Sequence, residues 1–365
     1  MVIPQHLTFF TKVFKKKRLA ANTQHPLFCI FAIMNEQPSI SNHQLSILIP
    51  TYNDDCRELV ASLQQQADYI SGLEYEILVA DDGSTDLEVA KNNAVIGQKD
   101  HCTYLRNEQN HGRSYIRNFL AKNARHNWLL FIDGDMKIQS PEFLLHYLDN
   151  IYEESQNAKN NAQSSKFNAQ SSMFNAQSSK FNVQSSKFIV LYGGYTISGT
   201  PQKGNLRYCY EKKCLPMHMA EKRRLEPYKD FHTSNFMVSR EVMLRHPLDE
   251  RFHHYGYEDV LWGKTLQQNN IPILHIDNPV VFADFEDNPS FVSKTEEGLR
   301  TLHQFSTELA DYSRLIPAAR KLGLLRPVVK VIYSLFRPVV RHQLCGKHPS
   351  LTLFTFYRLG YYLSL

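Results

Sequence analysis

Two carboxylates stand one residue apart at the end of an apolar run. Asp133 and Asp135 flank Gly134 directly after residues 128–132 (WLLFI). A run this short, bounded by polar residues, predicts a central strand covered on both faces. Ligands bind at the carboxyl ends of strands in open parallel sheets, and hard divalent cations take one or two carboxylates together with substrate phosphates. The pattern predicts a metal site that holds a nucleotide diphosphate, with an ordinary surface turn as the alternative.

A second predicted strand also ends in carboxylates. Residues 45–50 (LSILIP) and 75–80 (YEILVA) predict two strands, and the apolar spacing within residues 55–70 predicts a helix between them. Short links make this a parallel βαβ unit. Because Asp81 and Asp82 follow its second strand, we expect negative charge to gather along one edge of the sheet.

Two arginines open the next predicted helix. Arg113 and Arg117 are four residues apart and therefore share a face near its start. Backbone N–H groups at a helix start attract anions, so an anion site is predicted there, with a solvated helix face as the alternative. The strand at 128–132 follows. The order β-α-β-α-β-α-β predicts an α/β fold whose mainly parallel sheet carries helices on both faces.

Acidic residues also begin a later helix. Glu258 and Asp259 precede an apolar helical pattern, and the helix dipole favours acids at this position, so a purely structural role is one interpretation. The aromatic and glycine residues just before them, 252–257 (FHHYGY), favour a sugar-sized pocket with a carboxylate at its rim. Residues 203–229, rich in Lys, Arg and Tyr, predict a loop or lid over the site.

Charge is unevenly distributed along the 365 residues. The formal net charge is +5, but residues 1–34 and 312–365 contain fourteen Lys/Arg and no acid, so the chain between them is acidic. This argues against nucleic acid as the main partner and for an anionic surface contacted by the ends. Six cysteines without a CxxC pair favour a reduced, cytosolic compartment.

The two ends and one insertion differ from the central part. Residues 1–44 predict an N-terminal extension, with Met34 as a possible alternative start. Tandem copies of a seven-residue unit (NAQSSKF) predict a disordered insertion over 158–187 within a single domain at 45–290. The region 291–365 predicts basic amphipathic helices, broken by its prolines, that contact an anionic membrane. A helical layer packed on the domain is the alternative.

In their order and spacing, five motifs resemble those of family 2 glycosyltransferases with the GT-A fold. They are 47–53 (ILIPTYN), 79–86 (VADDGSTD), 110–118 (NHGRSYIRN), 132–135 (IDGD) and 257–259 (YED). The resemblance covers roughly residues 45–285, and the C-terminal helices look like those of bacterial surface-polysaccharide and lipopolysaccharide enzymes. It implies an inverting transferase that moves a sugar from a nucleotide-diphosphate donor, usually a UDP-sugar, to a hydroxyl of a glycan or lipid-linked glycan.

The resemblance also implies roles for individual residues. Asp259, or Glu258 beside it, would be the catalytic base. Asp135, with help from Asp133, would bind Mn²⁺ or Mg²⁺, and His275 is a weaker candidate ligand. The implied nucleotide-sugar contacts come from Pro50, Thr51, Tyr52, Asn53, Asp81, Asp82, Arg113, Arg117, Asp133 and Gly134. An enzyme of this kind would act in the cytoplasm, peripherally on the inner face of the cytoplasmic membrane.

Two other functions remain open at this stage. A sugar nucleotidyltransferase shares the sheet and its acids but needs a glycine-rich basic loop after the first strand, where residues 50–53 (PTYN) stand instead. A catalytically silent membrane-associated scaffold would fit the basic C-terminal region. The presence of Asp133, Asp135 and Asp259 together speaks against the scaffold.

Overall fold

The computed structural model describes residues 39–154, 189–199 and 202–365. Met34 and the predicted insertion at 158–187 lie outside the described residues. Residues 1–38 of the predicted N-terminal extension, 1–44, also lie outside the described residues. The first strand begins at Ser39, so it includes residues 39–44 of that predicted extension. Residues 39–365 form one compact unit.

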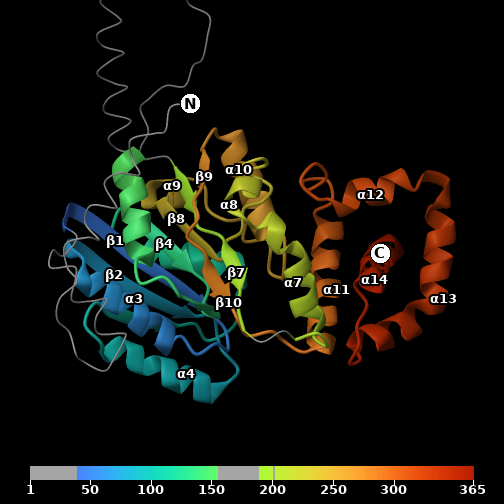
Figure 1. The fold of residues 1–365 in the computed structure, drawn as a ribbon, viewed down its shortest axis with the longest axis horizontal. Coiled ribbons are helices and arrows are strands. Elements are labelled where there is room, and N and C mark those ends of the chain that lie inside the picture. Colours follow the sequence, from blue (N-terminus) through green and yellow to red (C-terminus); the bar gives the residue numbers. More distant parts are fainter. Residues whose placement is uncertain (1–38, 155–188, 200–201) are drawn as a thin grey trace, which may run out of the picture. The chain divides into compact units, whose positions relative to one another are not determined.

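A seven-stranded sheet forms the centre of this unit (Figure 1), in the order β3-β2-β1-β4-β8-β6-β9. Neighbouring strands run parallel except β8, which is antiparallel to both β4 and β6. The bounds are β1 Ser39–Thr51, β2 Ser71–Asp81, β3 Cys102–Arg106, β4 Trp128–Ile132, β6 Val190–Tyr192, β8 Asn235–Ser239 and β9 Ile273–His275.

Helices cover both faces of this sheet because its central strands are apolar on both sides. In β4, Leu130 and Ile132 join one buried cluster while Leu129 and Phe131 join the other. The first face is covered by α3 (Arg57–Tyr69) and a helix over 143–154, and the second by α5 (Arg113–Asn123), α9 (Arg240–Arg245) and α10 (Glu258–Gln268). Between β2 and β3 the chain forms α4 (Leu87–Ala94) and the short helix η2 (Val95–Gln98). The predicted α/β architecture, a mainly parallel sheet with helices on both faces, is confirmed.

A smaller sheet and a set of helices complete the wall around the strand ends. The order of the smaller sheet is β5-β10-β7, with β5 Met136–Lys137, β10 Val280–Phe282 and β7 Tyr195–Ile197. The segment 203–229, predicted as a loop or lid over the site, forms α7 (Leu206–Cys214), η3 (Leu215–Met217) and α8 (Ala220–Arg223). The loop was wrong because tertiary packing buries Leu206, Tyr208 and Ala220, which a local pattern does not reveal, whereas the lid stays a prediction.

Helices also form the C-terminal region, as predicted. They are α11 (Asn288–Gln304), α12 (Leu315–Lys321), η4 (Gly323–Leu325), α13 (Arg326–Cys345) and α14 (Leu351–Ser364). The predicted domain boundary at 290 falls inside α11. Pro327 occupies the first turn of α13, where a missing N–H costs little, and Pro338 lies inside that helix without ending it, contrary to our expectation. Within the described residues, no helix is both long and apolar enough to span a bilayer.

Candidate active site

The carboxyl ends of β1, β2 and β4 meet at one edge of the large sheet. Thr51 pairs with Asp81 across the parallel strands, and Gly134 N donates to Pro50 O at 3.2 Å. Beyond this edge lies a cavity of about 1700 Å³. Of the predicted site residues, the cavity lining includes Asn53, Arg113, Asp133, Gly134, Asp135, Glu258 and Asp259, but not Pro50, Thr51, Tyr52, Asp81, Asp82, Arg117 or His275.

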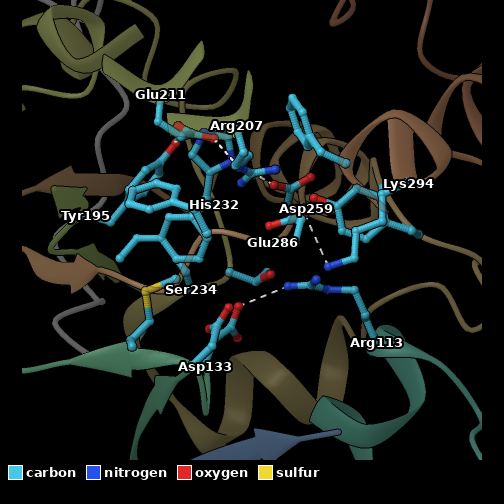
Figure 2. A pocket seen from close by; sticks show the side chains of 18 of the residues that line it. Arg113, Asp133, Tyr195, Arg207, Glu211, His232, Ser234, Asp259, Glu286 and Lys294 are labelled. Carbon is cyan, nitrogen blue, oxygen red and sulfur yellow. Dashed lines mark hydrogen bonds and ion pairs between the residues drawn. The ribbon is translucent and has the colours of Figure 1, made fainter. Parts of the chain in front are cut away.

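Asp133 is held by both predicted arginines. Arg113 Nη2 donates to Asp133 Oδ2 at 2.9 Å (Figure 2), and the fully buried Arg117 donates to Oδ1. Arg113 Nε also lies 2.9 Å from Glu258 Oε1, so this one guanidinium ties the end of β4 to the start of α10. Burial raises the pKa of Glu258, although the charge of Arg113 opposes the shift.

Carboxylates concentrate where the metal was predicted. Burial, followed by repulsion from Asp133 and Asp54, raises the pKa of Asp135 to about 7. Burial and repulsion from Asp133 likewise raise the pKa of Asp54 to about 6. Asp54 was not among the predicted site residues, although its place just after the first strand was a usable signal. Such mutual repulsion marks a site where a cation would stabilise the ionised forms.

The side chains around Asp135 provide some of the ligands that a hard divalent cation requires. The groups are carboxylate oxygens, which Mg²⁺ and Mn²⁺ prefer. Within residues 39–154, 189–199 and 202–365, however, no group of three or more His, Cys, Asp or Glu side chains is placed to hold a metal by itself. Asp133 and Asp135 would therefore hold the ion together with oxygens from the donor phosphates, as Mg²⁺ sites commonly do.

A short turn presents Asp259 to the cavity. Gly256 and Tyr257 both have positive φ, 98° and 70°, and α10 begins at the next residue. His232 Nδ1 lies 2.8 Å from Asp259 Oδ2. Burial opposes the ionisation of both groups, but their hydrogen bond and opposite charges lower the pKa of Asp259 and raise that of His232. Nothing in the sequence pattern pointed to His232.

Asp81 and Asp82 have structural partners behind the cavity wall. Asp81 accepts hydrogen bonds from Ser84 N at 2.7 Å and Tyr104 Oη at 2.6 Å. Asp82 accepts from Gly112 N at 2.9 Å, which fixes the loop before Arg113. These carboxylates thus shape the loops beside the cavity, and their predicted contact with the nucleotide stays a prediction.

The surroundings of His275 speak against its predicted role as a metal ligand. Its side chain is fully buried outside the cavity lining. Nε2 lies 2.9 Å from Pro227 O and Nδ1 lies 3.1 Å from Arg223 Nη1, so both ring nitrogens are engaged. Burial, with a further effect of Arg223, lowers the pKa of His275 to about 4. The ring is a structural group that supports β9.

Comparison with known proteins identifies the segment that carries the carboxylates at the strand ends. Residues 46–163 match the model of the family described as glycosyl transferase family 2. This segment is therefore similar to family 2 glycosyltransferases. The match bears out the resemblance that the motifs indicated, while the bacterial surface-polysaccharide type stays a prediction.

Two curated relatives are glycosyltransferases by name. An uncharacterized glycosyltransferase of Haemophilus influenzae is 33% identical over 93 residues, which is 25% of this chain and 29% of that protein. One of Rickettsia conorii is 29% identical over 119 residues, 32% of this chain and 19% of that protein. The chain spans less than a third of the length of each of these relatives.

Two solved structures are similar to the chain at low sequence identity. TarS 1–349 of S. aureus has a TM-score of 0.43 at 17% identity, with 86% of this chain and 89% of that chain covered. The mannosyltransferase PcManGT of Pyrobaculum calidifontis, solved with GDP-Man and Mn²⁺, has a TM-score of 0.47 at 12% identity, with 93% and 92% covered.

Proposed function

We propose that this protein is an inverting glycosyltransferase that moves a sugar from a nucleotide-diphosphate donor, a UDP-sugar, to a hydroxyl of a glycan or lipid-linked glycan. One observation carries the proposal. The Asp133 and Asp135 carboxylates of the family 2 domain share a cavity with Asp259, a carboxylate paired with His232 and supplied by a separate element. Donor activation needs carboxylates that bind a cation, and acceptor deprotonation needs a carboxylate that accepts the proton. Both must lie in the same cavity.

The donor end of the cavity is built for a leaving diphosphate. A divalent cation, Mn²⁺ or Mg²⁺, supplies charge neutralisation for the phosphate oxygens when it is bound by Asp133 and Asp135. Arg113 lines the cavity beside them and is already oriented by Asp133 and Glu258. Negative charge grows on the leaving group in the transition state, so a preset guanidinium stabilises that state more than the ground state.

Asp259 is the base that we propose for the acceptor hydroxyl. As the hydroxyl oxygen attacks the anomeric carbon, its proton passes to Asp259 while the bond to the diphosphate breaks on the opposite face. His232 orients the carboxylate and holds it ionised. Glu258 is the weaker candidate, because Arg113 engages it and burial raises its pKa. Inversion follows from this single displacement.

A panel of nucleotide sugars tests the donor assignment. The purified chain is heated with each compound, with and without Mn²⁺, beside the variant Asp135→Ala. We expect one UDP-sugar to raise the unfolding temperature of the parent only when Mn²⁺ is present. In Asp135→Ala, Mn²⁺ should add nothing to the effect of that UDP-sugar. No shift with any donor would contradict the proposal and favour the catalytically silent scaffold. Equal stabilisation of parent and variant by UDP with metal would refute the role of Asp135.

We further propose that the C-terminal helices contact the anionic inner face of the cytoplasmic membrane, the predicted location. Eight apolar side chains of η4 and α13 are exposed by 42% to 96%. They recur at the three- and four-residue spacing of a helical stripe: Leu324, Leu325, Val328, Val331, Ile332, Leu335, Phe336 and Val339. Exposed Arg326, Lys330 and Arg337 alternate with them, the pattern of a helix that lies on an anionic surface.

Vesicle sedimentation tests the membrane contact. Phosphatidylcholine vesicles with and without phosphatidylglycerol are mixed with the parent, with the double variant L335E and F336E, and with L87E. Leu87 is 70% exposed but lies on α4, far along the chain from the C-terminal stripe. We expect the parent and L87E to bind the anionic vesicles and the double variant to lose binding. Equal binding of all three proteins would overturn this proposal without touching the donor assignment.

A further inference from the structure

Among the described residues that line the cavity, one basic side chain lies near no carboxylate. Each other lysine or arginine in the lining lies within 4 Å of a carboxylate: Arg57 of Asp55, Arg113 of Asp133 and Glu258, Lys137 of Asp284, Arg207 of Glu211, Lys229 of Glu226, Lys294 of Glu286 and Arg314 of Asp230. Arg358 also lines the cavity, but it forms no ion pair with any residue of the described part of the chain. A partly buried guanidinium without a counter-ion is unusual, because charges removed from water are normally paired.

Aromatic rings surround this guanidinium. Arg358 Nη1 donates to Tyr210 Oη at 3.2 Å, and its Cζ lies 5.5 Å from the centre of the Tyr210 ring and 5.7 Å from that of Phe354. Tyr210, Phe291 and Phe354 line the same cavity and lie 5.3–6.1 Å apart by ring centre. Flat apolar faces beside a few fixed polar groups are the usual lining of a ligand pocket.

The C-terminal helix holds Arg358 in a fixed place. Phe354 and Arg358 are four residues apart on α14 and therefore share a face. On the same helix, fully buried Tyr357 donates to Glu296 of α11, and a Cβ on Gly360 would lie 2.3 Å from the Tyr333 ring of α13. Close packing at these positions means that the direction of α14 is set by the core and not by Arg358 itself.

This part of the cavity adjoins the proposed base. Tyr257, also in the lining, immediately precedes Glu258 and Asp259 at the start of α10. The donor end of the cavity is lined by the carboxylates of Asp54, Asp133 and Asp135. The end between α7, α11 and α14 has the opposite character, since its one guanidinium without an ion pair needs an anion.

We propose that the space between α7, α11 and α14 is the acceptor subsite, and that Arg358 binds an anionic group, a phosphate or carboxylate, carried by the acceptor glycan. This inference rests on the proposed transferase function, because only a transferase needs an acceptor subsite. Tyr210, Phe291 and Phe354 provide the faces against which the sugar ring packs. The acceptor is therefore an acidic glycan and not a neutral one.

Binding of matched sugars tests the proposal. The full chain is first saturated with UDP and Mn²⁺ to fill the donor site, and then titrated with glucose, glucose 6-phosphate and glucuronate by ligand-observed NMR. The variants are Arg358→Gln, Arg358→Lys and, as the matched control, Arg314→Gln, which removes a cavity arginine that has a carboxylate partner. Thermal stabilisation by UDP with Mn²⁺ shows in each variant that the donor site is folded.

We expect the parent to bind at least one charged sugar about tenfold or more tightly than glucose, since charge-assisted hydrogen bonds to a guanidinium are strong. Arg358→Gln should remove this preference and leave glucose binding unchanged, whereas Arg358→Lys and Arg314→Gln should keep most of it. Preference for glucose 6-phosphate identifies a phosphate, and preference for glucuronate identifies a carboxylate.

Two results would overturn the proposal. One is equal affinity of the parent for charged and neutral sugars, which needs no variant to fold. The other is a preference that survives Arg358→Gln. If UDP with Mn²⁺ fails to bind the parent, the transferase assignment fails, and the same titration without nucleotide still decides whether Arg358 binds anions.

Discussion

The pair formed by Asp259 and His232 leads to a prediction that needs no knowledge of the acceptor. The two side chains are 18% and 35% exposed, and His232 Nδ1 lies 2.8 Å from Asp259 Oδ2. The pKa of His232 is raised above 6.5 by its carboxylate partner against the effect of burial, and that of Asp259 is lowered below 3.8. The variant Asp259→Asn removes the negative charge while keeping the size of the side chain.

The direction of the effect follows from linkage between protonation and folding. A raised histidine pKa adds stability below pH 6.5 that is lost as the pH rises through the folded-state value. A lowered aspartate pKa adds stability above pH 3.8 that is lost as the pH falls. The pair therefore contributes most between about pH 4 and pH 6.5. Solvent reaches both groups, so we expect a loss of about 1–2 kcal/mol near pH 5.5 in the variant and much less near pH 9.

Two measurements check this prediction. NMR titration of labelled histidines should show the pKa of His232 falling by about one unit or more in Asp259→Asn, since one unit corresponds to about 1.4 kcal/mol. Denaturant unfolding at pH 5.5 and pH 9 gives the stability difference. The control Asp284→Asn removes another cavity aspartate, 3.3 Å from Lys137, and should leave His232 unchanged. A His232 pKa that is the same in the parent and in Asp259→Asn would refute the ion pair. With an acceptor in hand, loss of transfer while metal-dependent UDP binding is retained in Asp259→Asn would match the role of Asp259 as base.

Three further changes test the framework around the cavity by denaturant unfolding. Gly134→Ala places a Cβ 2.9 Å from Cys56 Sγ, so we expect the free energy of unfolding to fall by about 1–3 kcal/mol. Stability equal to that of the parent would show that the loop shifts to make room for the methyl group. Arg117→Gln leaves the buried Asp133 with one arginine, so we expect the free energy of unfolding to fall by about 3 kcal/mol. Removal of an exposed ion pair costs far less. A loss below about 1 kcal/mol would contradict this expectation. His275→Gln should cost about 1–2 kcal/mol through lost hydrogen bonds and leave the Mn²⁺ dependence of UDP binding intact; loss of that dependence would restore the histidine as a metal ligand.

Local patterns were sufficient for the sheet and for the acids at its edge. Runs such as 45–50 and 128–132 are apolar because their strands are buried on both faces, and this requirement is visible in any short window. Parallel strands then bring their carboxyl ends to one edge, so Asp133, Asp135 and Gly134 could be placed beside a cavity before the structure was known. The shared helix face of Arg113 and Arg117 follows from spacing alone.

Only the tertiary structure decided which groups meet across the cavity. His232, in the loop before β8, and Asp259 of α10 are 27 residues apart, and Tyr210 of α7 and Arg358 of α14 are 148 apart. Periodicity reports which face of a helix or strand is buried, but it carries no information on which distant element covers that face. The same limit explains the error over 203–229, where burial against other elements stabilises helices that propensity alone does not predict. The cavity's chemistry therefore depends on how α7, α10 and α14 pack around the sheet edge.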